Sequence, residues 1–336
     1  MLGKGESERN PAARPALPPV GRAAGTGREP PAGGSLPSTK RQGGRARQMP
    51  ITVAAAAVVD RLASVGYVAS RPVALAVAGA LATADGEPGA RALLLEGPPG
   101  AGKTALAEAL AAGWGWPLVA CQLHAWSDAD ELFVGVDVVA AVAGDAAAVR
   151  QDGVLARAAR AAEEGPVVLL LDEVDKAPER AEALLLDWLQ SGRVPIQPGV
   201  HLRTRLDRVL VVLTSNGTRP LTEALLRRCR RVRVAPLPVE TQERILGERT
   251  GLPAGLVRLT WRAAREVALT DGVVALSLQE GVRLLREIAD CAESAEDVRV
   301  ALAGWAARGE AGRQAAAHTR LHAAVWAEVG QWRRSR

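Results

Sequence analysis

The sequence predicts an α/β protein, in which a parallel five-stranded sheet covered by helices is followed by a smaller all-helical domain. Between residues 92 and 234, short apolar runs alternate with longer stretches of helical periodicity. This alternation is typical of parallel strands that helices bury on both faces. After Pro238 the strand-like runs stop, and the remaining periodic stretches all suit helices. With 336 residues, the chain is long enough for about two domains.

The first element in order is an N-terminal arm, residues 1–50. It contains nine Gly and eight Pro but few branched apolar residues, so it cannot bury enough surface to fold and is expected to be disordered. Met49 stands where the composition changes and is an alternative translation start. Residues 1–48 are therefore expected either to form a flexible tail or not to be translated.

Charge and cysteine usage exclude several classes of protein. The arm carries nine basic and three acidic residues, whereas the rest of the chain carries 33 basic and 34 acidic residues. The nearly neutral body gives no support for a nucleic-acid surface. Three scattered cysteines argue against a disulfide framework or a zinc site and favour the reducing cytoplasm. No apolar run approaches the ~18 residues that span a bilayer.

The α/β core with its N-terminal linker is expected over residues 51–237. Helices are predicted at 53–63 and 73–83, and an amphipathic helix is predicted around residues 181–189, where apolar side chains recur at helical spacing. The five predicted strands are 92–96, 118–123, 167–171, 209–213 and 232–234. A helical lid over 238–310 is expected to contain helices at 240–250, 253–269, 278–291 and 295–308. A C-terminal helical tail, 311–336, is either an extension of the lid or a partner helix.

A phosphate-binding loop is predicted directly after the first strand. The pattern of Gly, four residues and then Gly-Lys-Thr is met by Gly97, Pro98, Pro99, Gly100, Ala101, Gly102, Lys103 and Thr104. An apolar strand before the motif and a helix after it form the context in which backbone N–H groups wrap phosphates. There Lys103 is expected to reach the β- and γ-phosphates of a nucleotide, and the Thr104 hydroxyl to bind Mg²⁺.

A pair of acidic residues, Asp172 and Glu173, follows the third apolar run. Ligands of α/β proteins bind at the C-terminal ends of the strands, where this pair is expected. Asp172 would hold Mg²⁺ through water, and Glu173 would act as the general base that polarises the attacking water. Alone, such a pair also suits a helix cap. Beside a phosphate-binding loop it indicates nucleotide hydrolysis.

Together these motifs resemble the AAA+ family of ATPases, and the resemblance extends to residues 214–216. These residues, Thr-Ser-Asn, end the fourth apolar run in the manner of the family's sensor 1. The resemblance implies that Asn216 contacts the γ-phosphate or the attacking water.

Residues 221–229, which end in Arg-Arg-Cys, look like the family's arginine-finger segment. The resemblance selects Arg228 as the arginine that neutralises charge on the γ-phosphate in a neighbouring subunit's site. The alternative is that Arg228 only decorates a helix end together with Arg227, Arg230 and Arg231.

Two insertions are similar to those of the MoxR-like group, which has a dynein-related type of AAA+ domain. Residues 127–137 and 153–158 resemble the two ends of its helix-2 insert, and residues 192–202 alternate apolar and polar side chains around Pro198 as in its β-hairpin before sensor 1. The resemblance covers residues 90–238 well and the helical lid loosely.

The chain departs from this group at sensor 2. Residues 277–279 are Ser-Leu-Gln, where the group often has Ser-Pro-Arg. Either Arg283 or Arg286 replaces the missing arginine, or both lie on a solvated helix face. Tyr67, upstream of the phosphate-binding loop, either lines the adenine pocket or is a core aromatic residue.

The resemblance implies a homo-oligomeric ring, usually a hexamer, that hydrolyses ATP with Mg²⁺ at subunit interfaces. It also implies a chaperone or remodelling role toward a client protein or complex, commonly with a von Willebrand factor A domain protein as partner. One rival is a DNA-directed motor or loader of the branch-migration or clamp-loader type, against which the nearly neutral body argues. The other is a nucleotide-gated interaction module that hydrolyses little, against which the pairing of Asp172 with Glu173 argues.

Overall fold

The structure is a computed structural model that describes residues 54–82, 91–136, 142, 150–197, 199–273, 276–318 and 320–336. The predicted N-terminal arm and the alternative start at Met49 lie outside the described residues. So do Pro198 of the predicted hairpin and most of the segment between the two ends of the insert. No helix among the described residues is long and apolar enough to cross a membrane.

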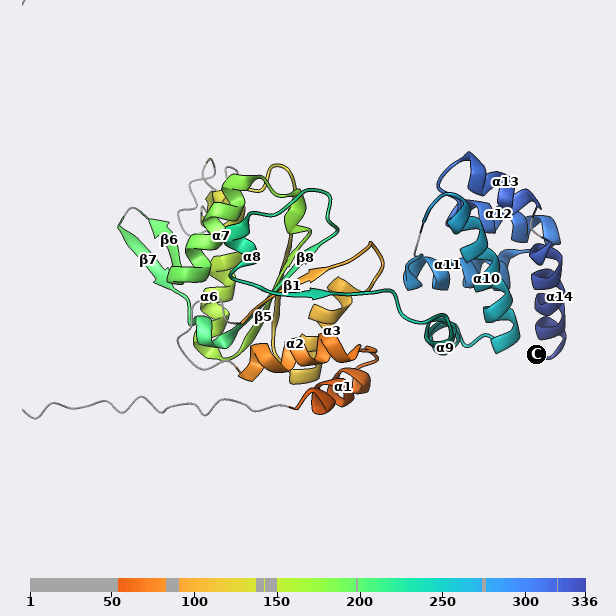
Figure 1. The fold of residues 1–336 in the computed structure, drawn as a ribbon, viewed down its shortest axis with the longest axis horizontal. Helices are drawn as coiled ribbons and strands as arrows, with labels where there is room; N and C mark the ends of the chain where they lie inside the picture. Colours follow the sequence, from red (N-terminus) through yellow and green to blue (C-terminus); the bar gives the residue numbers. More distant parts are fainter. Residues whose placement is uncertain are drawn as a thin grey trace, which may run out of the picture. The chain divides into compact units, whose positions relative to one another are not determined.

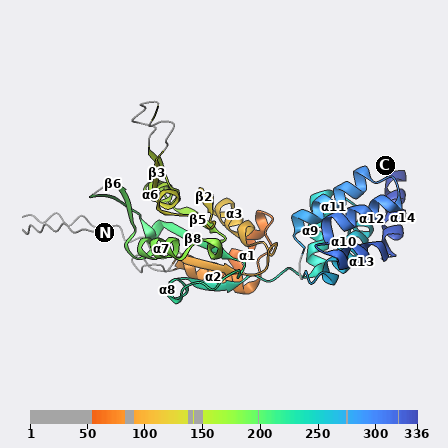
Figure 2. The same ribbon diagram turned by 90° about the horizontal axis from the view of Figure 1, so that it is seen from above.

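The predicted α/β fold class is confirmed by a sheet of five parallel strands in the order β2-β5-β8-β1-β9 (Figures 1 and 2). Their bounds are Ala92–Glu96 (β1), Leu118–Gln122 (β2), Val167–Asp172 (β5), Val209–Ser215 (β8) and Arg230–Arg233 (β9). Each predicted apolar run thus corresponds to a strand, but β9 begins two residues before its run. It lies at an edge of the sheet, where its backbone pairs with β1 while its arginine side chains stay exposed. The apolar run therefore does not mark where β9 begins.

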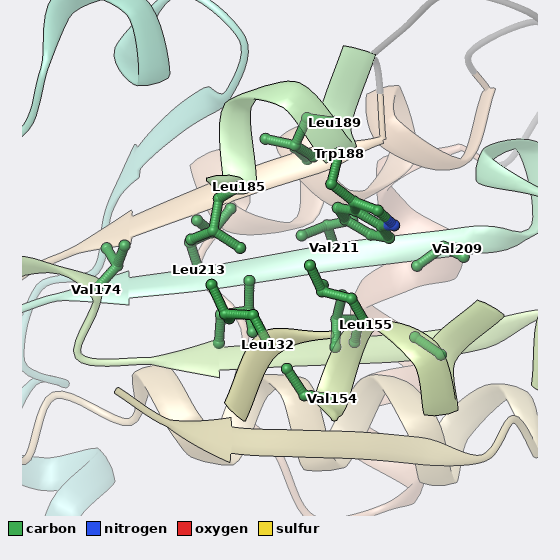
Figure 3. Packing of buried hydrophobic residues seen from close by; sticks show 14 of the residues in the cluster. Leu132, Val154, Leu155, Val174, Leu185, Trp188, Leu189, Val209, Val211 and Leu213 are labelled. Atoms are coloured by element: carbon green, nitrogen blue, oxygen red, sulfur yellow. The ribbon is translucent and has the colours of Figure 1, made fainter. Parts of the chain in front are cut away.

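Helices cover both faces of the sheet, as Figure 1 shows. One face packs against α1 (Ala55–Ser64), α2 (Arg71–Ala82) and α3 (Lys103–Trp114), and the other against α6 (Val154–Glu164) and α7 (Glu179–Ser191). Successive residues of a strand point to opposite faces of the sheet. In β1, Leu93 and Leu95 therefore belong to a first apolar cluster, with α1, α2 and α3, while Leu94 belongs to a second, with α6 and α7. Figure 3 shows the second cluster, in which Trp188 of α7 lies fully buried near Val211 of β8.

The two ends of the predicted insert lie together. The first end forms α4 (Ala129–Leu132) and β3 (Val134–Val136), and β3 pairs antiparallel with β4 (Arg150–Asp152) before α6. The Gly153 N–H donates to the Phe133 carbonyl at 2.7 Å. A Cβ at Gly153 would lie 2.5 Å from the Glu131 carbonyl oxygen, so only glycine allows this close approach of the two ends.

The predicted β-hairpin before β8 is confirmed. β6 (Arg193–Gln197) pairs antiparallel with β7 (Val200–Arg203), with an irregularity in register between Pro195 and Gln197. The hairpin is tied to α7, since the Trp188 indole N–H donates to the Thr204 hydroxyl at 2.9 Å. A short 3₁₀ helix, η2 (Leu206–Arg208), then leads into β8.

Beyond Pro238, the described residues form helices and their connections, with no strand among them, as predicted. The helices are α9 (Val239–Thr250), α10 (Ala254–Thr270), α11 (Leu278–Cys291), α12 (Ala295–Ala306), α13 (Glu310–His318) and α14 (Leu321–Arg334). The four predicted lid helices correspond to α9–α12. The last two helices pack on α10 and α12, and buried Ala316, Val325 and Val329 join the same apolar cluster. Within the described residues, the C-terminal stretch is therefore packed as part of the helical region.

Candidate nucleotide-binding site

The loop between β1 and α3 has the backbone that a phosphate-binding loop requires. Gly100 and Gly102 adopt φ of 77° and 88°, in the left-handed region that favours glycine. At Gly97 a Cβ would lie 2.3 Å from the Val234 carbonyl oxygen, so glycine lets the loop start against the neighbouring chain segment. The loop therefore turns tightly enough to direct its backbone N–H groups toward a bound anion.

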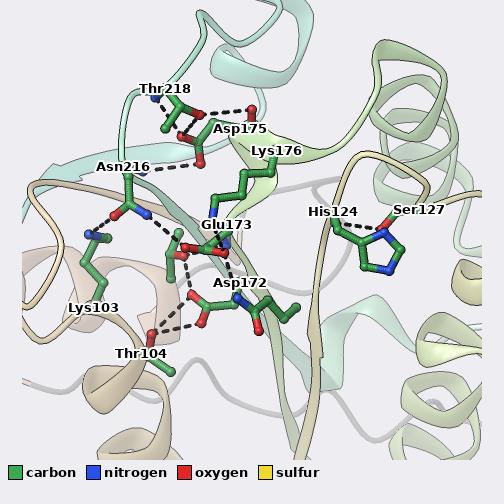
Figure 4. Close-up of polar contacts among 12 residues, drawn as sticks. Lys103, Thr104, His124, Ser127, Asp172, Glu173, Asp175, Lys176, Asn216 and Thr218 are labelled. Carbon is green, nitrogen blue, oxygen red and sulfur yellow. Dashed lines mark hydrogen bonds and ion pairs between the residues drawn. The ribbon is translucent and has the colours of Figure 1, made fainter.

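Lys103, at the start of α3, lies across this loop with its side chain buried. Its ammonium group donates to the carbonyl oxygens of Gly97 at 2.7 Å and Pro98 at 2.9 Å, and to Asn216 Oδ1 at 2.7 Å (Figure 4). Burial lowers the pKa of Lys103, while the negative charges of Asp172, Asp175 and Glu173 oppose that shift. These surrounding carboxylates favour the charged ammonium that a phosphate site needs.

Thr104 and Asp172 form a cluster of oxygen atoms beside the loop. The Thr104 hydroxyl donates to Asp172 Oδ2 at 3.0 Å and lies 3.2 Å from Oδ1. The Thr214 hydroxyl of β8 donates to Asp172 Oδ1. Hydroxyl and carboxylate oxygens are the ligands that Mg²⁺ accepts, so this pair fits a magnesium ion that also contacts phosphates.

Glu173 follows β5 and is the only non-glycine residue with positive φ in the described part of the chain, at 57°. Such a backbone persists only where the surroundings hold it, and strain of this kind clusters at functional sites. Its backbone N–H donates to the Thr214 hydroxyl at 2.9 Å. The Glu173 carboxylate lies beside Asn216 and Lys176 (Figure 4).

Three side chains donate to the Glu173 carboxylate. Gln122 Nε2 and Lys176 Nζ both donate to Oε2, each at 2.7 Å, and Asn216 Nδ2 donates to Oε1 at 3.1 Å. Burial by itself would raise the pKa of Glu173. The hydrogen bonds from Lys176 and Gln122 outweigh it, so this pKa lies below its ordinary value. Both oxygens of the candidate base thus accept hydrogen bonds from neighbouring side chains.

The segment that carries Asn216 is anchored by a second carboxylate. Asp175 lies in the 3₁₀ helix η1 (Val174–Lys176) and is 2% exposed. It accepts hydrogen bonds from the Thr218 N–H at 2.8 Å, the Thr218 hydroxyl at 2.7 Å and the Asn216 N–H at 3.3 Å. Burial opposes ionisation here, but these hydrogen bonds lower the pKa of Asp175. Asn216 is thereby held in register with Glu173.

One cavity of about 510 Å³, a volume typical of small-molecule sites, lies beside these groups. The cavity lies at the C-terminal ends of β1, β5 and β8. Of the predicted site residues it brings together Pro99, Gly100, Ala101, Gly102, Lys103, Thr104, Asp172, Glu173 and Asn216.

Tyr67 both lines the cavity and packs in the apolar core. It lines the cavity, and its hydroxyl donates to the Gly102 carbonyl at 3.3 Å. It also packs against the apolar cluster beneath α1, α2 and α3. Burial raises the pKa of Tyr67 to about 12, so the phenol is neutral.

The lid residues of the cavity include Arg249 of α9, which the sequence did not single out. Arg283 lies instead with its guanidinium group 5.9 Å from the centre of the Trp305 ring, and Arg286 donates to the Arg249 carbonyl at 3.4 Å. Neither is among the described residues that line the cavity. Both arginines face other residues of the helical lid.

Gly97 and Pro98, at the start of the loop, are not among the described residues that line the cavity, and neither is Arg228. Arg228 follows the one-turn helix α8 (Glu223–Leu226), and its guanidinium group donates to the Ala224 carbonyl at 2.9 Å, with Gln190 of α7 beside it. Its neighbour Arg227 is far more exposed, with 80% of its side chain accessible. Arg231 pairs with Glu96 at 3.1 Å.

Sequence reasoning missed the side chains that orient Glu173 and Asn216, namely Gln122, Asp175, Lys176 and Thr218. Gln122 and Thr218 belong to no local motif, because each acts through a residue at least 40 positions away. For Lys176, the composition of the sequence contains one indication. The chain has four lysines against 38 arginines, so a lysine next to the acidic pair is unusual for this composition.

Comparison with known proteins bears on residues 92–229, which match the family described as AAA domain (dynein-related subfamily). No curated protein matches the chain. The matched segment runs from the first strand to the end of residues 221–229, and it contains the phosphate-binding loop, the acidic pair and Asn216. The family match and the P-loop fold, with its cavity at the strand ends, together support an AAA+ ATPase.

Proposed function

We propose that this protein is an oligomeric AAA+ ATPase of the MoxR-like group that hydrolyses ATP to ADP and phosphate and uses the energy to remodel a client protein or complex. One observation carries the proposal. Lys103, Thr104, Asp172, Glu173 and Asn216, which come from three different strand ends, converge on one cavity beside a glycine-rich loop. This is the combination of charges and donors that phosphoryl transfer to water requires.

Binding begins with the loop and Lys103. The loop N–H groups and the ammonium group of Lys103 receive the phosphates, and Lys103 exchanges its protein acceptors for phosphate oxygens. Tyr67 and the apolar side chains of Val68 and Val73 line the same cavity and suit the base and ribose. Thr104 and Asp172 would hold Mg²⁺, which would neutralise phosphate charge when bound.

Hydrolysis then depends on Glu173 and Asn216. The Glu173 carboxylate accepts a proton from the attacking water, while the Asn216 amide orients that water or the γ-phosphate. Their 3.1 Å hydrogen bond supports this division of roles, because it holds the two groups at the same point of the cavity.

A ring assembly is supported by the position of Arg228 outside its own subunit's cavity. An arginine in that position cannot, without rearrangement, stabilise the charge that develops on the γ-phosphate of a nucleotide bound in its own subunit. It can serve a neighbouring subunit's site, and it would have to exchange the Ala224 carbonyl for phosphate oxygens to do so. Such an arrangement makes hydrolysis depend on assembly, in the usual form of a hexamer.

The MoxR-like assignment is supported by the β3–β4 pair between β2 and α6 and by the β6–β7 hairpin before β8. Both are additions to the five-stranded sheet at the positions that the resemblance assigns to the group's insertions. By that resemblance the client is a protein or complex, and a von Willebrand factor A domain protein is the first partner to test.

The decisive experiment is Glu173→Gln. The amide cannot accept the proton, so ATP binding should persist while turnover falls about 10²–10⁴-fold. Turnover is measured as phosphate release at saturating ATP and Mg²⁺, and binding by titration with a fluorescent ATP analogue. Proteins retained with this ATP-bound variant, and not with Lys103→Ala, are candidate clients. Hydrolysis at the rate of the unchanged protein would refute Glu173 as the base.

A further inference from the structure

Glu182, in the first turn of α7, is a carboxylate inside the α/β core that is not among the described residues lining the nucleotide cavity. Its side chain is fully buried, and both of its oxygens meet donors from the segment after β8. One oxygen forms an ion pair with the Arg219 guanidinium group, and the other accepts the Thr222 backbone N–H at 3.1 Å. Arg219 also donates to the Ala177 carbonyl, just before α7, at 3.2 Å. One carboxylate thus joins the start of α7 to residues 219–222.

Stability alone does not account for this buried ion pair. Removing a carboxylate from water is costly, and replacing a buried pair by apolar side chains of similar volume is often neutral or stabilising. The Arg219 side chain keeps 28% of its surface exposed, so the cost of burial falls mainly on Glu182. An apolar side chain at position 182 could fill the same space, but it could not hold a guanidinium group and a backbone N–H at defined distances and angles. The pair therefore indicates that the position of residues 219–222 matters.

Residues 217–222 connect the nucleotide cavity to the segment that carries Arg228. Asn216, just before them, lines the cavity. Thr222, at their end, is the N-cap of α8, and its hydroxyl accepts the Leu225 N–H at 3.4 Å. A helix of a single turn has little stability of its own, so the contacts at its ends decide where it lies. The N-cap of α8 is the residue whose backbone N–H Glu182 holds.

We propose that Glu182 is a positioning residue for Arg228. By holding Arg219 and the Thr222 N–H, it sets where α8 begins and thereby where the guanidinium group of Arg228 is presented to a neighbouring subunit. The inference rests on the proposed function, because it takes Arg228 as the arginine that serves the neighbour's γ-phosphate. Loss of Glu182 therefore impairs hydrolysis in the neighbour's site and leaves nucleotide binding in its own site intact.

The first test is Glu182→Gln, which keeps the size of the side chain and removes its charge. An amide has one acceptor oxygen, so its NH₂ group must face one of the two donors and residues 219–222 should shift. A displacement of roughly 1 Å near a reacting group can cost about 100-fold in rate, so turnover at saturating ATP should fall by about 100-fold while ATP affinity stays nearly unchanged. Glu179→Gln, at an exposed carboxylate in the same turn of α7, is the matched control and should change neither.

A second variant separates positioning from folding. Glu182→Met combined with Arg219→Met replaces the pair by apolar side chains of similar size, so the urea midpoint of unfolding should be kept or raised. Turnover should nevertheless fall as it does in Glu182→Gln, because neither methionine can hold the Thr222 N–H. Normal turnover in this folded double variant would overturn the inference.

Mixing experiments show in which site the defect lies. Glu182→Gln subunits keep Glu173, and Glu173→Gln subunits present a well-placed Arg228, so their mixture should recover activity. A mixture of Glu182→Gln with Arg228→Ala should not recover, because every interface then lacks a correctly placed arginine. Glu182→Gln combined with Arg228→Ala in one chain should be no slower than Arg228→Ala alone, since both changes remove the same interaction.

Two outcomes of mixing would contradict the positioning role. One is a mixture of Glu182→Gln with Glu173→Gln that stays inactive, although Arg228→Ala with Glu173→Gln recovers. The other is a combined Glu182→Gln and Arg228→Ala chain that is slower than Arg228→Ala, since Glu182 would then act on its own site. The Arg228→Ala variant separates the two proposals. If it is inactive while Glu182→Gln is unchanged, only the role of Glu182 is wrong, and if it is fully active, both fail.

Discussion

Individual residues of the site act through charge that the fold has concentrated at one end of the sheet. Lys103 is buried and donates to two loop carbonyls and one amide oxygen, while three carboxylates lie close enough to favour its charged form. A cation in this state is matched to phosphates, because phosphate oxygens can take over all of its hydrogen bonds.

Replacing Lys103 with Ala should therefore weaken nucleotide binding. Charge-assisted hydrogen bonds are each worth about 1.5–3 kcal/mol, so affinity should fall by at least about tenfold. Titration with a fluorescent ATP analogue measures the change. Arg205→Met is the control, because Arg205 pairs with Asp207 before β8 and is not among the described residues that line the cavity. Unchanged affinity in Lys103→Ala would show that the loop is not the phosphate site.

At the scale of elements, the helical region contains a polar junction between the end of α10 and the start of α13. Asp271 accepts backbone hydrogen bonds from Arg308, Gly309 and Gly312 at 2.6, 2.7 and 2.8 Å. A Cβ at Gly312 would lie 2.1 Å from the Asp271 carboxylate, so glycine is needed for this approach. One side chain thus accepts hydrogen bonds from N–H groups before and within the first turn of α13 and joins this helix to α10.

This junction predicts a pH-dependent stability. The backbone N–H groups of Gly309 and Arg308 are the main causes that lower the pKa of Asp271 in the folded protein. Its contribution is therefore present above the ordinary Asp pKa of about 3.9 and is lost as pH falls through the lower folded value. Asp271→Asn should reduce the unfolding midpoint at neutral pH, and its difference from the unchanged protein should shrink in acid.

Urea unfolding of the full chain, followed by circular dichroism at pH 7 and near pH 3, measures both effects. Asp290→Asn makes the same substitution at an exposed position of α11 and is the matched control. A constant difference between Asp271→Asn and the unchanged protein at all pH values would contradict a role for the carboxylate charge.

At the scale of the whole molecule, the arrangement of Arg228 predicts that catalysis depends on neighbouring subunits. Arg228→Ala should leave ATP affinity nearly unchanged, while turnover falls by about 10³–10⁵-fold, the range known for arginines supplied in trans. Binding and phosphate release are measured on the same preparation, at concentrations where assembly is verified by light scattering. Activity at the normal level would shift the assignment to Arg227 or Arg231.

Mixing experiments decide whether Arg228 acts across an interface. Arg228→Ala subunits keep Glu173, and Glu173→Gln subunits keep Arg228, so mixed rings contain some complete interfaces. These should recover activity that neither variant shows alone. Inactive mixtures, with mixed rings shown to form, would mean that Arg228 serves its own site or that every site must be intact.

Patterns within short stretches of the sequence predicted the strands and helices whose formation depends on neighbouring residues. Fully apolar runs indicate buried parallel strands wherever both faces are covered, which holds for β1, β5 and β8. The same criterion placed the start of the edge strand β9 incorrectly. Helical periodicity identified α9–α12, since each buries one stripe against the others.

The sequence by itself determined the phosphate-binding loop, because its glycines, Lys103 and Thr104 are adjacent and act through the backbone that they form. Only the tertiary structure decided which partners orient Glu173, since Gln122 and Asn216 lie 51 and 43 residues away from it along the chain. It likewise placed Arg249 at the cavity and directed Arg283 to Trp305. The physical reason is common to these cases. A hydrogen bond depends on distance and angle in space, and parallel strands bring distant positions to one edge of a sheet.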